Sequence, residues 1–161
     1  MGRATVVWRI GHRAASSVED QACGSALFAG RWHTLRSGPR PRRVIYAASS
    51  RALAQLEKRV HANGVAPVNQ ALFALTLRPD IDIRSAQALG LAPHWRDDIA
   101  VSQAFGDSWL DRGAGLALWV PSFVEPGEAN ILINPELAPG KWTPRGLLFL
   151  TLWRTYEGRT G

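Results

Sequence analysis

Alternating apolar and polar positions predict a series of β-strands along the chain. Residues 5–10 (TVVWRI) alternate so that Trp8 and Ile10 share one face of a strand, while Val7 and Arg9 share the other. An arginine near a strand end most simply extends to water, which is one interpretation of Arg9. A short apolar run bounded by turn residues predicts a buried strand at residues 44–48, and strand-like segments occur at 69–78, 81–84, 115–120 and 129–134.

Helical patterns are fewer and shorter than strand patterns. The clearest helix begins after an N-cap at Ser49 or Ser50 and ends at Asn63-Gly64. Short helices are predicted at residues 85–91 and 101–110, and at most one turn near residues 18–23. Because helices do not alternate regularly with strands and no repeat or linker occurs, we expect one α+β domain over residues 1–161 with a mixed β-sheet core.

Glu57 occupies an unusual position in the clearest helix. It falls on one stripe with Leu53, Leu56 and Val60, at the spacing of a helix face that packs on a core. A buried carboxylate costs several kcal/mol unless it is paired. Two ordinary explanations remain open: Glu57 lies at the edge of the stripe, or it pairs with His61 one turn later. The third is a functional carboxylate close to Tyr46 of the preceding strand.

Arg31 is adjacent to Trp32 in a predicted tight turn that starts at Gly30. Stacking on an aromatic ring would hold the guanidinium rigid and direct it at an anion such as a diphosphate. An ordinary cation–aromatic surface pair explains the same residues equally well. The proline-rich basic stretch 36–43 that follows is predicted to form a loop whose charges are solvated.

Composition limits the classes of function. The 161 residues suffice for one buried core, and the single cysteine, Cys23, excludes an internal disulfide. No signal-peptide core or membrane-length apolar run occurs, so we expect a cytoplasmic protein. The formal net charge of +6 favours anionic partners. No nucleic-acid-binding module is recognised, and the spacing of the four histidines does not indicate a metal site.

Seven short segments in order resemble the RES-domain family, the toxins of bacterial toxin–antitoxin pairs. The segments are WRI (8–10), AGRW (29–32), VIYAA (44–48), LAQLE (53–57), GDSW (106–109), VPS (120–122) and NILINP (130–135). The resemblance covers about residues 5–137. It implies a fold related to the ADP-ribosyltransferases, and a substrate, NAD, whose nicotinamide–ribose bond is broken by phosphate or water. No prosthetic group or metal is implied.

The resemblance also implies site residues and a partner. The matching site positions are Arg9, Arg31, Tyr46, Glu57 and Ser122, with Asn130 as an addition. Glu57 would stabilise positive charge on the ribose or hold its hydroxyls, and Tyr46 would stack on the nicotinamide or ribose. Arg9 and Arg31 suit a diphosphate, and Ser122 would orient the ribose or an incoming phosphate. The implied partner is an Xre-like helix-turn-helix antitoxin that blocks the active site.

Residues 138–161 depart from the family pattern. The family leads us to expect a histidine soon after Pro135 and a last strand that ends in an Asp-Pro-Arg-like motif, but neither occurs in this sequence. Two alternatives to an active NAD-degrading toxin therefore remain: a folded but inactive family member, and a non-catalytic basic module that binds nucleic acid or an acidic protein.

Overall fold

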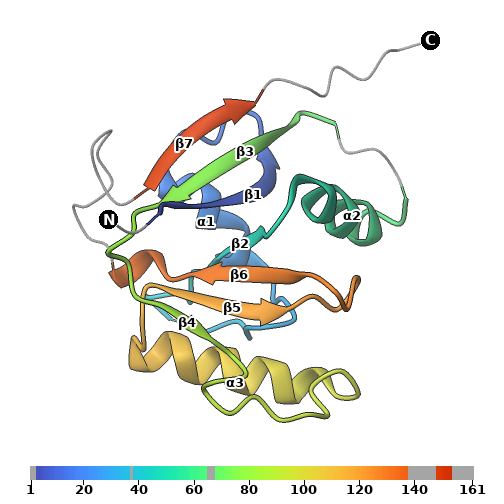
Figure 1. Ribbon diagram of the computed structural model, residues 1–161, viewed down its shortest axis with the longest axis vertical. Helices are drawn as coiled ribbons and strands as arrows, with labels where there is room; N and C mark the ends of the chain where they lie inside the picture. Colours follow the sequence, from blue (N-terminus) through green and yellow to red (C-terminus); the bar gives the residue numbers. More distant parts are fainter. Residues whose placement is uncertain (1–2, 37, 65–67, 138–147, 154–161) are drawn as a thin grey trace.

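The computed structural model describes residues 3–36, 38–64, 68–137 and, for the backbone alone, 148–153 (Figure 1). The elements in chain order are β1 (Thr5–His12), α1 (Val18–Leu27), β2 (Ile45–Ala48), α2 (Arg51–His61), β3 (Gln70–Leu77), β4 (Ile83–Ser85), α3 (Ile99–Arg112), β5 (Ala117–Pro121), β6 (Ala129–Ile133), the 3₁₀ turn η1 (Pro135–Leu137) and β7 (Leu148–Trp153).

One mixed sheet forms the centre of the described structure. Its seven strands lie in the order β4-β5-β6-β2-β1-β3-β7. Only the β4–β5 pair is parallel, and the other neighbours are antiparallel. Sequential β-α-β units would have produced a mainly parallel sheet. The arrangement confirms the α+β prediction.

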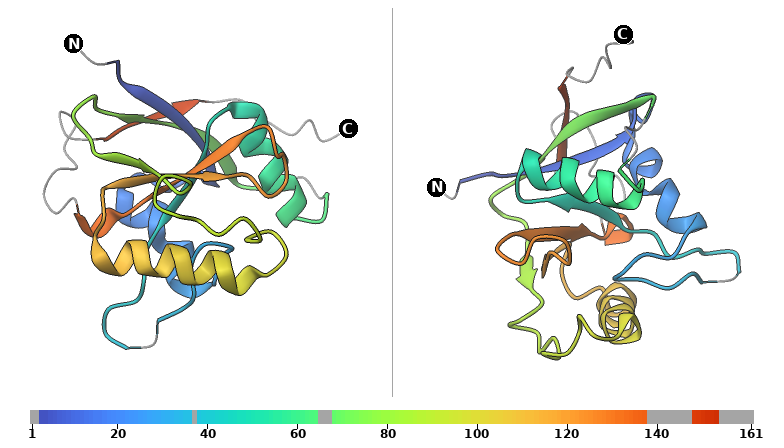
Figure 2. Two further views of the ribbon diagram at one scale, coloured as in Figure 1. Left: turned by 60° about the horizontal axis from the view of Figure 1, so that its bottom comes forward. Right: turned by 90° about the vertical axis from the view of Figure 1, so that its right-hand side faces the viewer.

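The helices cover both faces of this sheet. Val18 and Ala22 of α1 pack in one apolar cluster with Val7, whereas Leu53 of α2 packs in another with Trp8. Val7 and Trp8 are neighbours on β1, and neighbouring strand residues point to opposite faces. Consequently α1 and α2 lie on opposite sides of the sheet, as the views in Figures 1 and 2 show.

α3 lies on the same side as α2. Trp109 and Leu110 of α3 share an apolar cluster with Leu118 and Leu132, and Tyr46 of β2 packs against this cluster. Two positions separate Tyr46 from Ala48, which packs with α2, so both side chains point to the same face. α2 and α3 therefore cover different parts of the same face of the sheet.

The sheet opens between its two central strands. β1 pairs with β3 over its whole length, but its register with β2 is limited to Trp8 opposite Ala48. β2 in turn pairs fully with β6. The backbone of β2 before Ala48 therefore has no strand partner on its β1 side, and its polar groups must find partners elsewhere.

α1 and the segment after β4 differ from the sequence-based prediction. α1 is a ten-residue helix because Ser17 and Asp20 form a capping box, in which the Ser17 side chain accepts from the Asp20 N–H and the Asp20 side chain accepts from the Ser17 N–H. The prediction of a helix at 85–91 is wrong. Ser85 ends β4, and the following turn stops at Gly90, which has a φ of 86°.

A glycine brings α3 against the turn that carries Arg31. A Cβ atom on Gly106 would lie 1.9 Å from the backbone oxygen of Trp32. Next to it, Asp107 accepts hydrogen bonds from the Thr34 N–H (3.0 Å) and the Thr34 hydroxyl (2.5 Å). Gln103 donates to the Gly30 carbonyl at 2.9 Å. The GDSW segment thus fixes the Gly30–Thr34 backbone.

Arginines of the basic loop also bind α3. Arg42 forms ion pairs with Asp107 at 3.2 Å and with Asp111 at 2.9 Å, and Arg36 pairs with Asp111 too. These pairs raise the pKa of Arg42 and lower that of Asp111, chiefly through the hydrogen bonds between the two side chains. The prediction that this stretch presents a solvated charged face is therefore wrong for Arg42, whose side chain is 13% exposed, whereas the side chain of Arg36 is 43% exposed.

The C-terminal stretch contributes an edge strand. β7 pairs antiparallel with β3, from Leu77 opposite Leu148 to Leu72 opposite Trp153. The rest of the atypical segment, residues 138–147 and 154–161, lies outside the described residues. The structure therefore does not test whether that segment leaves the protein active. None of the helices in the described ranges has the length and hydropathy needed to cross a bilayer.

We predict that Gly106→Ala destabilises the fold by about 3 kcal/mol, because the added methyl group overlaps the Trp32 carbonyl and forces α3 away from the turn. Gly24→Ala, in the exposed part of α1, is the matched control. A Cβ atom there meets nothing within 4 Å, so the substitution should stabilise the helix by about 0.5–1 kcal/mol. Urea unfolding of both variants measures the difference, and equal free energies of unfolding would contradict the proposed close packing.

Candidate active site

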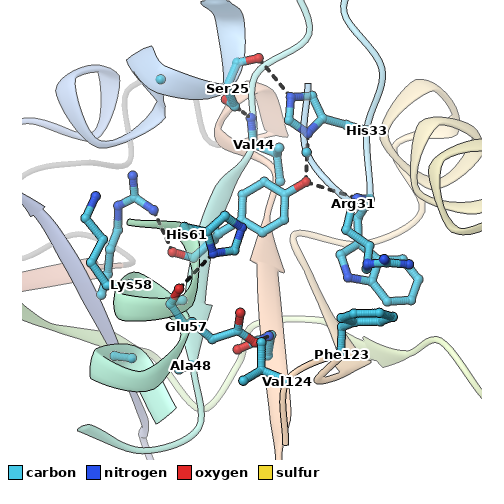
Figure 3. Close-up of a pocket in the computed structure, with 18 of the residues that line it drawn as sticks. Ser25, Arg31, His33, Val44, Ala48, Glu57, Lys58, His61, Phe123 and Val124 are labelled. Carbon is cyan, nitrogen blue, oxygen red and sulfur yellow. Dashed lines mark hydrogen bonds between the residues drawn. The ribbon is translucent and has the colours of Figure 1, made fainter. Parts of the chain in front are cut away.

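A cleft of about 790 Å³ lies where the sheet opens between β1 and β2. This volume falls within the range of about 300–1,000 Å³ typical of small-molecule sites. Both strands, α1, α2, the Gly30–His33 turn and the segment after β5 contribute to its walls. Figure 3 shows residues of several of these elements directed toward one another across the cleft.

Glu57 of α2 reaches the centre of this cleft. Its Oε1 atom accepts hydrogen bonds from the Ser122 hydroxyl at 2.9 Å and from the Asn130 amide at 2.6 Å. Ser122 directly follows β5, and Asn130 belongs to β6. The other oxygen, Oε2, accepts no hydrogen bond from the described residues, so the carboxylate is held by one atom and presents the other to the cleft.

The prediction that Leu53, Leu56, Glu57 and Val60 form one core-packing face of α2 is only partly correct. Leu53 is buried, but Leu56 is 40% exposed and Val60 is 51% exposed. The buried residues of α2 are Leu53 and Ala54. Glu57 lies on the same side of the helix, one turn later. His61 binds the backbone carbonyl of Glu57 at 2.7 Å, not the carboxylate, so the pairing alternative is wrong.

Ser122 is a holding residue with no capacity left for a ligand. Its side chain is buried, and its hydroxyl donates to Glu57 while accepting from the N–H groups of Val124 (3.2 Å) and Glu125 (3.0 Å). A hydroxyl has one donor and two acceptor positions, and all are used. Arg96 fixes the same turn by donating to the carbonyls of Ser122 and Phe123. The predicted contact of Ser122 with ribose or phosphate would require this turn to rearrange.

Tyr46 lines the cleft with its ring and has its hydroxyl tied back into the protein. The hydroxyl accepts from the Trp32 N–H at 3.2 Å and lies 2.7 Å from Nδ1 of His33. Nε2 of His33 is 2.9 Å from the Ser25 carbonyl, which can only accept, so in the neutral ring Nδ1 accepts from Tyr46. Burial raises the pKa of Tyr46, which keeps the phenol protonated for this bond.

The Tyr46 hydroxyl also explains the glycine that precedes Arg31. A Cβ atom on Gly30 would lie 2.5 Å from this hydroxyl. The turn therefore approaches β2 as closely as a residue without a side chain allows. This contact fixes how far Arg31, the next residue, lies from β2.

Arg9 occupies the opening between the central strands. Its Nη1 donates to the Tyr46 carbonyl at 2.8 Å, one of the groups on the β1 side of β2, and its Nε donates to the Gln21 side chain at 2.9 Å. Burial lowers the pKa of Arg9 to about 10, so the guanidinium remains charged at neutral pH. The prediction that Arg9 shares a face with Val7 agrees with the structure, but the side chain is held inside the cleft and does not simply extend to water.

Arg31 stacks on the ring of Phe123, with its guanidinium carbon 3.7 Å from the ring centroid. Its Nη1 atom is buried and has no hydrogen-bond partner among the described residues. Burial and the nearby charge of Arg96 lower the pKa of Arg31, whereas the charge of Glu57 raises it. A buried donor without a partner costs free energy, and a ligand anion would relieve that cost.

The six predicted site residues are brought to one cleft, but not into one contact network. Ser122 and Asn130 both donate hydrogen bonds to Glu57, and Arg9 binds the backbone of Tyr46. Ser122 does not line the cleft itself, whereas the other five do. Their catalytic and binding roles remain predictions.

Sequence reasoning missed four residues that position the site: Gln21, His33, Arg96 and Gln103. Each acts on a predicted residue or its backbone through the hydrogen bonds described above. Gln21 follows the Ser17–Asp20 capping box, which is the one local signal that would have revealed α1. The other three contacts join distant segments and leave no sequence pattern. No group of three metal-ligating side chains occurs within the described ranges.

Comparison with known proteins gives one consistent family. The model of the RES domain matches residues 6–143. The chain is 37% identical over 139 residues to a "Prs ADP-ribosylating toxin" of Sphingobium sp., a match that covers 81% of this chain and 83% of the relative. A "Toxin Res" of Pseudomonas putida is 33% identical, with coverage of 81% and 85%, and one of Yersinia enterocolitica is 33% identical, with coverage of 70% and 72%. These matches confirm the resemblance, and the chain belongs to the RES-domain family.

Proposed function

We propose that this protein is a toxin that breaks the nicotinamide–ribose bond of NAD. The observation that carries the proposal is the Glu57 carboxylate, which Ser122 and Asn130 hold through Oε1 while Oε2 stays open to the cleft. A carboxylate fixed in this way needs no rearrangement when positive charge develops next to it. The half-buried site strengthens that interaction by excluding part of the water.

The chemistry resembles glycoside cleavage. The bond between ribose C1′ and the nicotinamide nitrogen breaks, the electron pair leaves with nicotinamide as the neutral base, and positive charge develops on the ribose. Glu57 would stabilise that charge or accept a hydrogen bond from a ribose hydroxyl through Oε2. A nucleophile then forms a new bond to C1′ and loses a proton.

The remaining cleft residues fit recognition of the dinucleotide. The ring of Tyr46 offers an aromatic face for ribose or nicotinamide. Arg31 offers a guanidinium that Phe123 holds in place and whose Nη1 lacks a partner, which suits an anion such as the diphosphate. Ser122 contributes by holding Glu57 and not by contacting substrate.

A protein nucleophile is a second candidate for the acceptor, alongside phosphate and water. The 37% identical relative carries the name "Prs ADP-ribosylating toxin", which favours transfer of ADP-ribose to a protein. Phosphate attack would yield ADP-ribose 1″-phosphate, water would yield ADP-ribose, and a protein acceptor would become labelled. Product analysis with labelled NAD and a bacterial lysate separates the three.

The names of the relatives also support a biological setting. Two relatives are called "Toxin Res", and we infer that this chain acts in the cytoplasm, arrests growth when unopposed, and is neutralised by an antitoxin of the Xre-like type. The rim of the cleft includes Phe28, Val60, Ile99 and Phe123, which are all at least 44% exposed. An apolar rim of this kind suits a protein that covers the cleft.

We predict that Glu57→Gln lowers kcat/KM for nicotinamide release from NAD by about 100-fold or more, because the amide removes the negative charge at the reacting ribose. The amide oxygen keeps an acceptor for Ser122 and Asn130, so the fold should persist. Nicotinamide is quantified by chromatography, with and without inorganic phosphate.

Glu19→Gln is the matched control for this substitution, because Glu19 is an exposed carboxylate on α1, away from the cleft. It should retain wild-type activity. Equal nicotinamide release by the wild type and the Glu57→Gln variant would contradict the proposed role of Glu57. Absence of release by the wild type, with and without phosphate or lysate, would contradict NAD cleavage itself.

We predict that Arg31→Lys lowers kcat/KM for NAD by about 10- to 100-fold, mainly through a higher KM. Lysine keeps the charge but loses the planar fork and its stacking on Phe123. The comparison is with Arg40→Lys in the exposed loop, which should not change KM. If both substitutions change KM equally, Arg31 contributes only to the general positive field of the protein.

A further inference from the structure

Lys58 is a cleft residue that neither the sequence motifs nor the proposed mechanism uses. It follows Glu57 on α2, is half-buried, and lines the cleft together with Arg9. In Figure 3 Lys58 and Arg31 lie on opposite sides of the site, with Glu57 between them. The cleft therefore has a second positively charged end.

No ion pair within the described part of the chain compensates the charges of Lys58 and Arg9. Among the described residues, the ion pairs involve neither side chain. Burial and then the charge of Arg9 lower the pKa of Lys58, which means that the two cations are close enough to repel each other. Holding two like charges together in a partly buried cleft costs free energy that a bound anion would recover.

Two hydrogen bonds fix the position of the Arg9 guanidinium group and leave one of its nitrogens for such an anion. Its Nε and Nη1 atoms are bound to Gln21 and to the Tyr46 carbonyl, and no hydrogen bond to the described residues uses its Nη2. No hydrogen bond to the described residues uses the Lys58 ammonium group either. One guanidinium nitrogen held in place and one flexible ammonium group therefore face the same end of the cleft, a combination that suits an oxyanion.

We propose that Arg9 and Lys58 together form a binding subsite for a phosphate group, at the end of the cleft opposite Arg31. The choice of phosphate over other anions rests on the proposed function. Two sources share this chemistry: inorganic phosphate, as the nucleophile that attacks the ribose, and the diphosphate of the dinucleotide. In either case Lys58 is a substrate-binding residue, and Arg31 is not the only cation that recognises the substrate.

Isothermal titration calorimetry tests the proposal without turnover. Wild type, Lys58→Gln and Lys58→Arg are each titrated with inorganic phosphate and, separately, with ADP-ribose. Lys58→Gln should weaken binding of at least one of these ligands about tenfold, which corresponds to about 1.4 kcal/mol, and Lys58→Arg should restore most of it. Urea unfolding checks that each variant folds.

The matched control is Arg40→Gln, which removes one positive charge from the exposed loop and should leave both affinities unchanged. A loss confined to inorganic phosphate assigns the subsite to the free anion, and a loss confined to ADP-ribose assigns it to the dinucleotide. The subsite is refuted if Lys58→Gln binds both ligands as tightly as the wild type, if Arg40→Gln weakens binding equally, or if the wild type binds neither ligand. No step of this experiment requires NAD cleavage. Phosphate or ADP-ribose binding at Lys58 can therefore be found in a protein that does not cleave NAD, and NAD cleavage can be found without a contribution of Lys58 to binding.

Discussion

A sheet that separates between its two central strands leaves backbone groups of β2 without a strand partner, and Arg9 occupies that gap. Its guanidinium binds the Tyr46 carbonyl and is itself oriented by Gln21 of α1. A buried carbonyl without a partner would cost free energy, so the charged side chain both permits the opening and places a cation in it. The cleft exists because the strands separate, and the separation is tolerated because an arginine satisfies the backbone there.

The same principle holds at the other walls of the cleft, where hydrogen bonds from neighbouring residues fix the functional groups. Ser122 holds Glu57 and is held by its own turn, which Arg96 in turn fixes through backbone carbonyls. The Tyr46 hydroxyl binds the turn that carries Arg31, and Gly106 lets α3 press against that turn. Preorganisation of this kind removes reorganisation from the chemical step, and it explains why the glycine and the aspartate of the GDSW segment matter although both lie outside the cleft.

Much of this could be predicted from the sequence, and the failures have physical causes. Alternation located the first central strand, an apolar run located the second because helices cover the sheet there on both faces, and Glu57 was identified from helix spacing alone. That spacing misjudged Leu56 and Val60, because helical periodicity shows which residues share a face and not whether a partner covers it. The segment 85–91 has helix-forming residues, but a strand pairs immediately before it and Gly90 ends the turn. Gln21, His33 and Arg96 act across long sequence separations, which no local pattern records.

The distribution of charge in the cleft bears on how a dinucleotide would lie in it under the proposed function. Glu57 interacts electrostatically with Arg31, whereas Arg9 and Lys58 interact with each other and form no ion pair among the described residues. Arg96 also lies near Arg31 and lowers its pKa more than Glu57 raises it, so positive charge is present at both ends of the cleft. NAD carries a positive nicotinamide ring and a negative diphosphate, so the orientation of lowest energy places the nicotinamide ribose at Glu57 and directs a phosphate toward uncompensated cations. Lys58 contributes to the positive charge at the end of the cleft opposite Arg31, because without it Arg9 alone, bound to a carbonyl and an amide, would supply that charge.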